Sequence, residues 1–180
     1  MSHYDDDSPV ETMWEGRFVT AKRKGKWEYV SRSRGIRAAV ILAIDDDPDD
    51  GQHVILVEQF RVPLGKNCIE LPAGLVGDHD ASADEDAATA AIRELEEETG
   101  YHADHMEDCG EFYSSPGMVS ESFSLFKADG LTKTGEGGGV DGEDIAVHRV
   151  ALDKLDKFIE EKRAQDAGID VRLLLLLQPR

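Results

Sequence analysis

Residues 93–101, RELEEETGY, are the most strongly patterned stretch of this sequence and decide how the rest is interpreted. Residues three and four apart on a helix share a face, so Glu94, Glu97 and Glu98 are predicted to project together. Like charges in this arrangement destabilise an isolated helix by about 0.2–0.5 kcal/mol per pair. Divalent cations would compensate, because Mg²⁺ and Mn²⁺ prefer clustered hard oxygen ligands. The alternative is that these residues form the solvated face of an acidic surface helix. A cluster of three glutamates taken alone favours this alternative.

The residues around this stretch predict the helix that carries it. Ser82 and Glu85 form a capping box at its start, and Gly100 is a plausible stop. An apolar stripe at helical spacing consists of Ala87, Ala88, Ala91, Ile92 and Leu95. Arg93 lies beside the carboxylates, and its planar fork could hold one of them in a fixed orientation.

Apolar runs predict strands before and after this helix. Residues 38–44 and 53–59 read as strands buried on two faces, and shorter strands are expected at 69–73, 110–114, 122–128 and 145–150. Residues 135–142 are Gly-rich and are expected to form a mobile loop. Two helices should follow, one within 152–165 and one at 171–178, whose five leucines are expected to pack into a core on most sides. This order predicts an α/β protein with a mixed sheet and helices on its faces.

Composition excludes several classes of partner. The chain has 38 acidic against 20 basic residues, a formal charge of −18, so nucleic acid and anionic membranes are not expected partners. No apolar run is long enough to span a bilayer, and the polar start does not resemble a signal peptide. Cys68 and Cys109 are interpreted as small buried residues that remain reduced, which places the protein in the cytoplasm. Residues 1–13 are expected to be a disordered tail, followed by a hairpin of strands 17–22 and 26–31 that turns at Gly25.

The full stretch resembles the Nudix box, Arg-Glu-apolar-x-Glu-Glu-x-Gly-apolar, at every specified position, and Glu85 stands eight residues before Arg93, as that box requires. A chance match in a chain of this size should occur less than about once in a thousand. Gly74 stands eleven residues before Glu85 where the box has six, so the loop 77–82 is interpreted as a five-residue insertion. The resemblance implies a Nudix-type α/β/α sandwich with an N-terminal β-hairpin extension.

The flanking sequence resembles the ADP-ribose and ADP-sugar pyrophosphatase branch of that family. Residues 57–61 (VEQFR) and 70–74 (ELPAG) resemble its lead into the box, residues 115–121 (SPGMVSE) its Ser-Pro-Gly loop, and residues 142–145 (GEDI) its late Glu-bearing loop. The resemblance implies that Mg²⁺, or Mn²⁺ in its place, is bound by two kinds of oxygen. These are the carboxylates of Glu94, Glu97, Glu98, Glu121 and Glu143, and the carbonyl of Ala73. It further implies that Glu97 and Arg93 act in catalysis and that a base is supplied by Glu143 or Asp141, a choice that stays open.

The same resemblance predicts substrate and organisation. Substrate contacts are expected from Arg61, Gly74, Pro116 and Glu121, and Phe18 and Trp27 are candidates either to stack on a base or to pack within their sheet. The expected reaction is hydrolysis of ADP-ribose to AMP and ribose 5-phosphate. Alternatives are GDP-mannose, another nucleoside diphosphate sugar, a dinucleotide, or a Nudix-like sensing module without turnover. Residues 14–35 are expected to support a homodimer, and 36–180 to form the catalytic domain.

Overall fold

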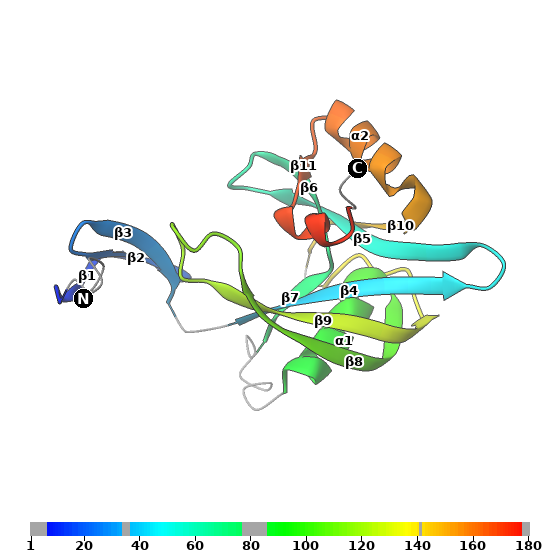
Figure 1. The fold of residues 1–180 in the computed structure, drawn as a ribbon, viewed down its shortest axis with the longest axis horizontal. Coiled ribbons are helices and arrows are strands. Elements are labelled where there is room, and N and C mark those ends of the chain that lie inside the picture. Colours follow the sequence, from blue (N-terminus) through cyan, green and yellow to red (C-terminus); the bar gives the residue numbers. More distant parts are fainter. Residues whose placement is uncertain (1–6, 34–36, 77–85, 141, 178–180) are drawn as a thin grey trace.

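A computed structural model of the chain describes residues 7–33, 37–76, 86–140 and 142–177. It contains two β-sheets (Figure 1). The first is antiparallel and consists of β1 (Val10–Glu15), β2 (Val19–Lys24) and β3 (Trp27–Arg32). The predicted hairpin with its turn at Gly25 is confirmed, and β1 adds a third strand to it. Because β1 begins at Val10, the expected tail was too long: residues 10–12 pair with β2, and Met13 lies where the register shifts.

The second sheet has eight strands and is mixed. Its order is β11-β6-β5-β4-β9-β8, with β10 paired to β5 and β7 paired to β4. Only β4 with β9 and β11 with β6 run parallel among its described pairs. The strands are β4 (Arg37–Asp47), β5 (Gly51–Arg61), β6 (Lys66–Glu70), β7 (Ala73–Val76), β8 (Tyr101–Tyr113), β9 (Ser122–Lys133), β10 (Ile145–Ala151) and β11 (Gly168–Ile169).

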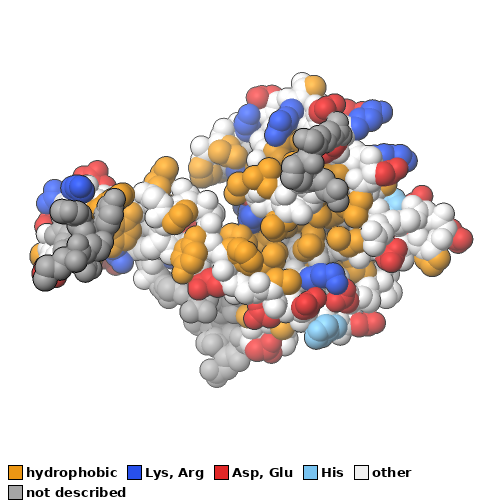
Figure 2. Space-filling model, viewed as in Figure 1, with side chains coloured by type: hydrophobic (Ala, Val, Ile, Leu, Met, Phe, Trp, Pro, Cys, Tyr) orange, Lys and Arg blue, Asp and Glu red, His pale blue; other side chains and the backbone are white. Residues whose placement is uncertain are grey.

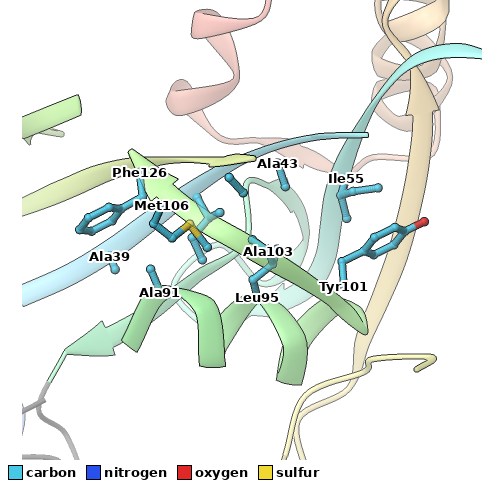
Figure 3. Packing of buried hydrophobic residues seen from close by; sticks show 11 residues of the cluster. Ala39, Ala43, Ile55, Ala91, Leu95, Tyr101, Ala103, Met106 and Phe126 are labelled. Carbon is cyan, nitrogen blue, oxygen red and sulfur yellow. The ribbon is translucent and has the colours of Figure 1, made fainter. Parts of the chain in front are cut away.

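Helices cover both faces of this sheet (Figure 1). The helix α1 (Ala87–Thr99) packs on one face, where Ala91 and Leu95 join a buried cluster that includes Ala103 and Ile55 (Figure 3). The opposite face is covered by α2 (Leu155–Ala164) together with the short 3₁₀ helices η2 (Leu152–Lys154) and η3 (Val171–Leu175). Alternate residues of β4 therefore enter different cores, which confirms both the predicted two-sided burial and the α/β/α sandwich.

Three local predictions were wrong. The strand β4 runs to Asp47, three residues beyond its predicted end at residue 44. Cys109 is exposed, although Cys68 is buried as expected. The leucine run forms the 3₁₀ helix η3, in which successive side chains point about 120° apart, so Leu173 is buried while Leu174 is 63% exposed.

None of the helices within the described residues is both long and apolar enough to cross a membrane.

Candidate active site

The helix α1 presents its acidic residues against the sheet because of how its ends are fixed. Asp86 caps the start, accepting hydrogen bonds from the backbone N–H groups of Ala88 and Thr89, and Gly100 ends the helix in the left-handed conformation at φ 70°. The expected capping box at Ser82 and Glu85 lies outside the described residues. Glu98 falls on the same side of the helix as Leu95, and it is only 8% exposed.

Two of the helix carboxylates face the start of β7. The Oε2 atom of Glu98 accepts a hydrogen bond from the backbone N–H of Ala73 at 3.0 Å. The next residue, Gly74, lies so close to Glu94 that a Cβ atom there would overlap the Glu94 side chain. Glycine is therefore required at this position to make room for a carboxylate.

The surroundings of Glu94 and Glu98 disfavour the ionised form of both carboxylates. Burial, together with the charges of Glu94 and Glu143, raises the pKa of Glu98 to about 8, against the lowering effect of the Ala73 hydrogen bond. Burial likewise raises the pKa of Glu94, and the charges of Glu97 and Glu143 add to it, although Arg93 opposes them. A bound cation would relieve these repulsions.

Arg93 contacts two of the helix carboxylates, those of Glu94 and Glu97. The sequence predicted that it would hold one carboxylate. Its Nη2 atom is 3.0 Å from Oε1 of Glu94, and its Nη1 atom donates a hydrogen bond to Oε2 of Glu97 at 2.9 Å. Glu97 is the most exposed of the three candidate helix ligands, at 32% of its side chain against 17% for Glu94. Glu97 is thus held by Arg93 rather than buried against β7.

The Gly-rich segment is tied to the end of α1 rather than lying free as a loop. Backbone N–H groups of Gly138 and Gly139 donate to the carbonyls of Glu98 and Glu97, at 2.9 and 3.1 Å. These bonds satisfy carbonyls that a helix terminus leaves unpaired. Gly139 lies against the side chain of Glu143, and the charge of Glu143 acts on both Glu94 and Glu98. The structure therefore brings Glu143 to the acidic helix, while Asp141 lies outside the described residues.

The donor set suits a hard divalent cation, although the side chains are not gathered around one. Among the described residues, no three His, Cys, Asp or Glu side chains converge closely enough to hold a metal ion as they stand. Arg93 and the Ala73 N–H each occupy carboxylate oxygens that a metal would need. The half-buried Glu94 and the buried Glu98, both with raised pKa values, and the space left by Gly74 nevertheless fit oxygen ligation of Mg²⁺ or Mn²⁺.

Arg61 lies near this cluster, and its side chain is anchored by a carboxylate for which the sequence predicted no role. Its Nε and Nη2 atoms donate to Oε1 and Oε2 of Glu70 at 2.6 and 2.9 Å. Hydrogen bonding to Glu70 raises the pKa of Arg61, and Glu98 adds to this shift. Glu70 also accepts a hydrogen bond from Arg172, which no motif in the sequence had identified.

Four of the predicted contacts lie apart from the acidic helix. Glu121 pairs with Arg32 of β3 at 2.5 Å. Pro116 is exposed in a turn closed by hydrogen bonds to the carbonyl of Ser115. Phe18 and Trp27 are 70% and 49% exposed on the first sheet, so they do not pack within it as core residues.

The fold and the acidic helix define a hydrolase of the Nudix class. Residues 35–170 match the family model described as NUDIX domain, and the chain belongs to this family. A crystal structure of an ADP compounds hydrolase shares the fold, with a TM-score of 0.63 and 22% identity over 84% of this chain and 80% of that one. Hydrolases of this family generally use divalent metal ions.

Within the family, the chain is similar to the ADP-ribose and ADP-sugar pyrophosphatase branch. It is 34% identical to an ADP-ribose pyrophosphatase of Bacillus subtilis over 72% of this chain and 66% of that protein. It is 36% identical to a methanol dehydrogenase activator of Bacillus methanolicus, with the same 72% and 66% coverage. A GDP-mannose pyrophosphatase of Cronobacter sakazakii is 36% identical over 93% of this chain and 81% of its own. The matched region thus spans just under two thirds of the first two relatives.

Proposed function

We propose that this enzyme hydrolyses the diphosphate linkage of a nucleoside diphosphate sugar, with ADP-ribose as the substrate and AMP and ribose 5-phosphate as products. The observation that carries the proposal is the packing of the half-buried Glu94 and the buried Glu98 against Gly74 and Ala73, with the charge of Glu143 acting on both. Such a concentration of carboxylates is unfavourable without a cation, and a diphosphate needs cations to neutralise its charge. The similarity to an ADP-ribose pyrophosphatase supports the choice of substrate.

The helix and the strand opposite it would hold Mg²⁺, or Mn²⁺ in its place. The ligands we propose are Glu94, Glu97 and Glu98 with the carbonyl of Ala73, and Glu143 from the loop. When bound, the metal would neutralise phosphate charge and lower the pKa of a water molecule. Arg93 already holds Glu94 and Glu97, so it would fix the orientation of those ligands.

The proton of the attacking water requires a base, and Glu143 supports that role best among the described residues. It is exposed to solvent, and its charge reaches the helix carboxylates. Asp141 is the alternative that the sequence left open. A base must come within hydrogen-bond reach of the water, either directly or when the loop closes on substrate.

Arg61 would bind the diphosphate, because its guanidinium lies close enough to Glu98 to influence the pKa of that residue. Pro116 and Glu121 belong to a loop that the first sheet contacts. Val30 of β3 exchanges backbone hydrogen bonds with Met118 and Ser120 at 2.9 Å each. We propose that this loop contacts the nucleoside or sugar. A metal-ligating role for Glu121 would require its ion pair with Arg32 to open.

We also propose a homodimer formed through the first sheet. The sheet and its turns, residues 10–33, carry six basic residues and three acidic residues in a chain whose net charge is −18: Arg17, Lys22, Arg23, Lys24, Lys26 and Arg32 against Glu11, Glu15 and Glu28. Trp14, Phe18 and Trp27 are exposed on it, and Figure 2 shows hydrophobic side chains both on this lobe and over the larger one. A basic, aromatic surface is complementary to the acidic body of a second copy. Light scattering that gives a monomer across micromolar concentrations would reject the dimer.

Phe18 and Trp27 would then stack on the base of a substrate bound at the shared surface. The cytoplasm is the compartment we propose, because both cysteines are free and reducing conditions keep them so.

GDP-mannose is the second candidate substrate. The GDP-mannose pyrophosphatase of Cronobacter sakazakii aligns over more of this chain than the ADP-ribose enzyme does. A dinucleotide substrate and a sensing module without turnover have no comparable support.

A panel of nucleoside diphosphate derivatives with Mg²⁺, followed by phosphatase-coupled phosphate release, tests the proposal. We expect ADP-ribose to be the best substrate and Glu97→Gln and Glu98→Gln to reduce turnover by roughly 100-fold or more. Preference for GDP-mannose would replace only the substrate assignment. No hydrolysis of any panel member by the folded wild type, or full activity of both variants, would reject the catalytic site.

A further inference from the structure

The buried carboxylate of Glu70 joins two arginines that are far apart in the sequence. Arg61, the last residue of β5, donates two hydrogen bonds to it, at 2.6 and 2.9 Å. Arg172 of η3 donates from Nη2 to Oε2 at 3.0 Å, the same oxygen that receives the second bond of Arg61. The side chain of Glu70 is only 4% exposed, so its carboxylate is shielded from water and is held in place by these charge-assisted bonds.

Arg172 is fixed in turn by Asp170. The Oδ1 atom of Asp170 accepts hydrogen bonds from the backbone N–H and from Nε of Arg172, both at 2.7 Å, and Oδ2 accepts one from Nη2 at 2.8 Å. The side chain of Arg172 is 17% exposed, and its guanidinium lies between two carboxylates. The four side chains form a row of alternating charge that ends at Arg61, whose side chain is 43% exposed.

The row ends beside the candidate active site. Glu70 precedes Ala73 by three residues, and the backbone N–H of Ala73 donates to Glu98. The charge of Arg61 lowers the pKa of Glu98, in opposition to the dominant effect of burial, so the two groups are within electrostatic reach. A substrate anion near Glu98 therefore experiences the charge that the row leaves at Arg61.

We infer that Arg172 is a positioning residue for Arg61, acting through Glu70. Arg172 holds the Glu70 carboxylate in place and offsets part of the negative charge of Glu70. As a result, Arg61 keeps one orientation, and its positive charge can attract an anionic diphosphate. The inference rests on the proposed function of the site. Without Arg172, the row of Arg61, Glu70 and Asp170 changes from net zero to net −1, and the carboxylate of Glu70 can turn.

Steady-state kinetics with ADP-ribose test the effect on binding. Arg172→Gln is expected to raise KM roughly 10-fold while kcat changes by less than about twofold, and Arg172→Lys, which keeps the charge but loses the fork, should fall between. In an Arg61→Gln background, Arg172→Gln should raise KM by less than about twofold, because the group it positions is gone. Lys157→Gln, an exposed change of the same charge in α2, is the matched control and should behave as wild type.

A second measurement does not depend on turnover. Nitrogen-15 NMR of the arginine side chains should show the Nε–H of Arg61 protected from solvent exchange in the wild type and in Lys157→Gln. In Arg172→Gln, the Nε–H signal of Arg61 should be broadened, and this proton should exchange with solvent faster. Equal KM increases in both Arg61 backgrounds, or an unchanged Arg61 signal in folded Arg172→Gln, would overturn the inference. If Arg172→Gln does not fold, Arg172→Lys decides on the same readouts. Absence of hydrolysis by the wild type would reject the proposed function, while the NMR comparison still decides the positioning role.

Discussion

Gly74→Ala is expected to disable the active site while leaving the fold intact. Gly74 pairs with Ala39 in the sheet, and it does not belong to the glycines with positive φ, so its backbone conformation suits alanine. The added Cβ would overlap Cγ and Cδ of Glu94. The obstacle is the end of a flexible side chain rather than backbone, so Glu94 must move and the strand need not.

The size of the effect follows from that displacement. Carbon atoms pack at about 3.5–4.0 Å, so the carboxyl group of Glu94 must retreat by about 1.5–2 Å. A misplacement of about 1 Å can reduce a rate by roughly 100-fold, which corresponds to about 2.7 kcal/mol of transition-state stabilisation. The free energy of unfolding should change by less than about 1 kcal/mol, because alanine lowers the entropy of the unfolded chain and so offsets the rearrangement.

The assay compares kcat/KM for ADP-ribose across a Mg²⁺ titration with the thermal midpoint of the same preparations. Gly135→Ala is the control, since a Cβ at Gly135 meets open space and its φ is not positive. Wild-type kcat/KM in folded Gly74→Ala would refute the argument that Glu94 must lie at this position. Loss of several kcal/mol of stability would instead show that Gly74 serves the fold.

Three further predictions concern stability. The pKa of Glu98 is raised from 4.5 to about 8, so between these values the folded chain binds a proton that the unfolded chain lacks. Metal-free protein should therefore lose a few kcal/mol of stability as pH rises through this window. Urea denaturation at pH 5 and pH 8 in EDTA should show this slope in the wild type and not in Glu98→Gln; equal slopes would contradict it. Lys162→Met removes the lysine partner of the Glu58 carboxylate, which is 14% exposed, leaves its hydrogen bonds to Asn67 and His148, and should cost about 1–3 kcal/mol at pH 7. Burial opposes ionisation of Glu58, but hydrogen bonds led by the one from Lys162 lower its pKa to about 2. The difference in the free energy of unfolding between Lys162→Met and wild type should therefore shrink as pH falls from 4.5 toward 2. A difference that stays constant with pH would show another cause. Gly137→Ala places a side chain at φ 70° against the backbone of Thr99 and should cost about 1–3 kcal/mol by thermal melting; a wild-type midpoint would mean that the Gly-rich segment does not pack on α1.

The sequence predicted the elements whose signals are local. The central strands β4 and β5 were predicted because continuous apolar runs are typical of strands buried on two faces, and both faces are covered. The strand β8 was predicted only over its last residues, although it begins at Tyr101. Tyr101, Ala103 and Met106 reach the core, but the residues between and after them are mostly polar and exposed, so pairing with β9 rather than continuous burial stabilises much of this strand. Tertiary pairing of this kind leaves no periodic signal.

The site was predicted where it depends on one helix and missed where it depends on distant segments. Helical spacing placed Glu94, Glu97 and Glu98 together, but it could not show that Arg93 would hold Glu97 while Glu98 was buried. The contact between Glu70 and Arg172 joins residues 102 apart in the sequence, and no pattern of residue types identifies it. Gly-rich composition suggested mobility, yet glycine also permits the backbone to approach a helix end closely.

The docking of the Gly-rich segment links the carboxylates to the stability of the whole site. Hydrogen bonds from Gly138 and Gly139 to the end of α1 favour the docked segment, whereas the charge of Glu143 near Glu94 and Glu98 opposes it. A cation bound among these carboxylates would remove their mutual repulsion and leave the hydrogen bonds intact. Metal binding and docking of the segment should therefore strengthen each other. The segment that carries the candidate base would then be held most firmly when metal is present, which is the state in which a base is needed.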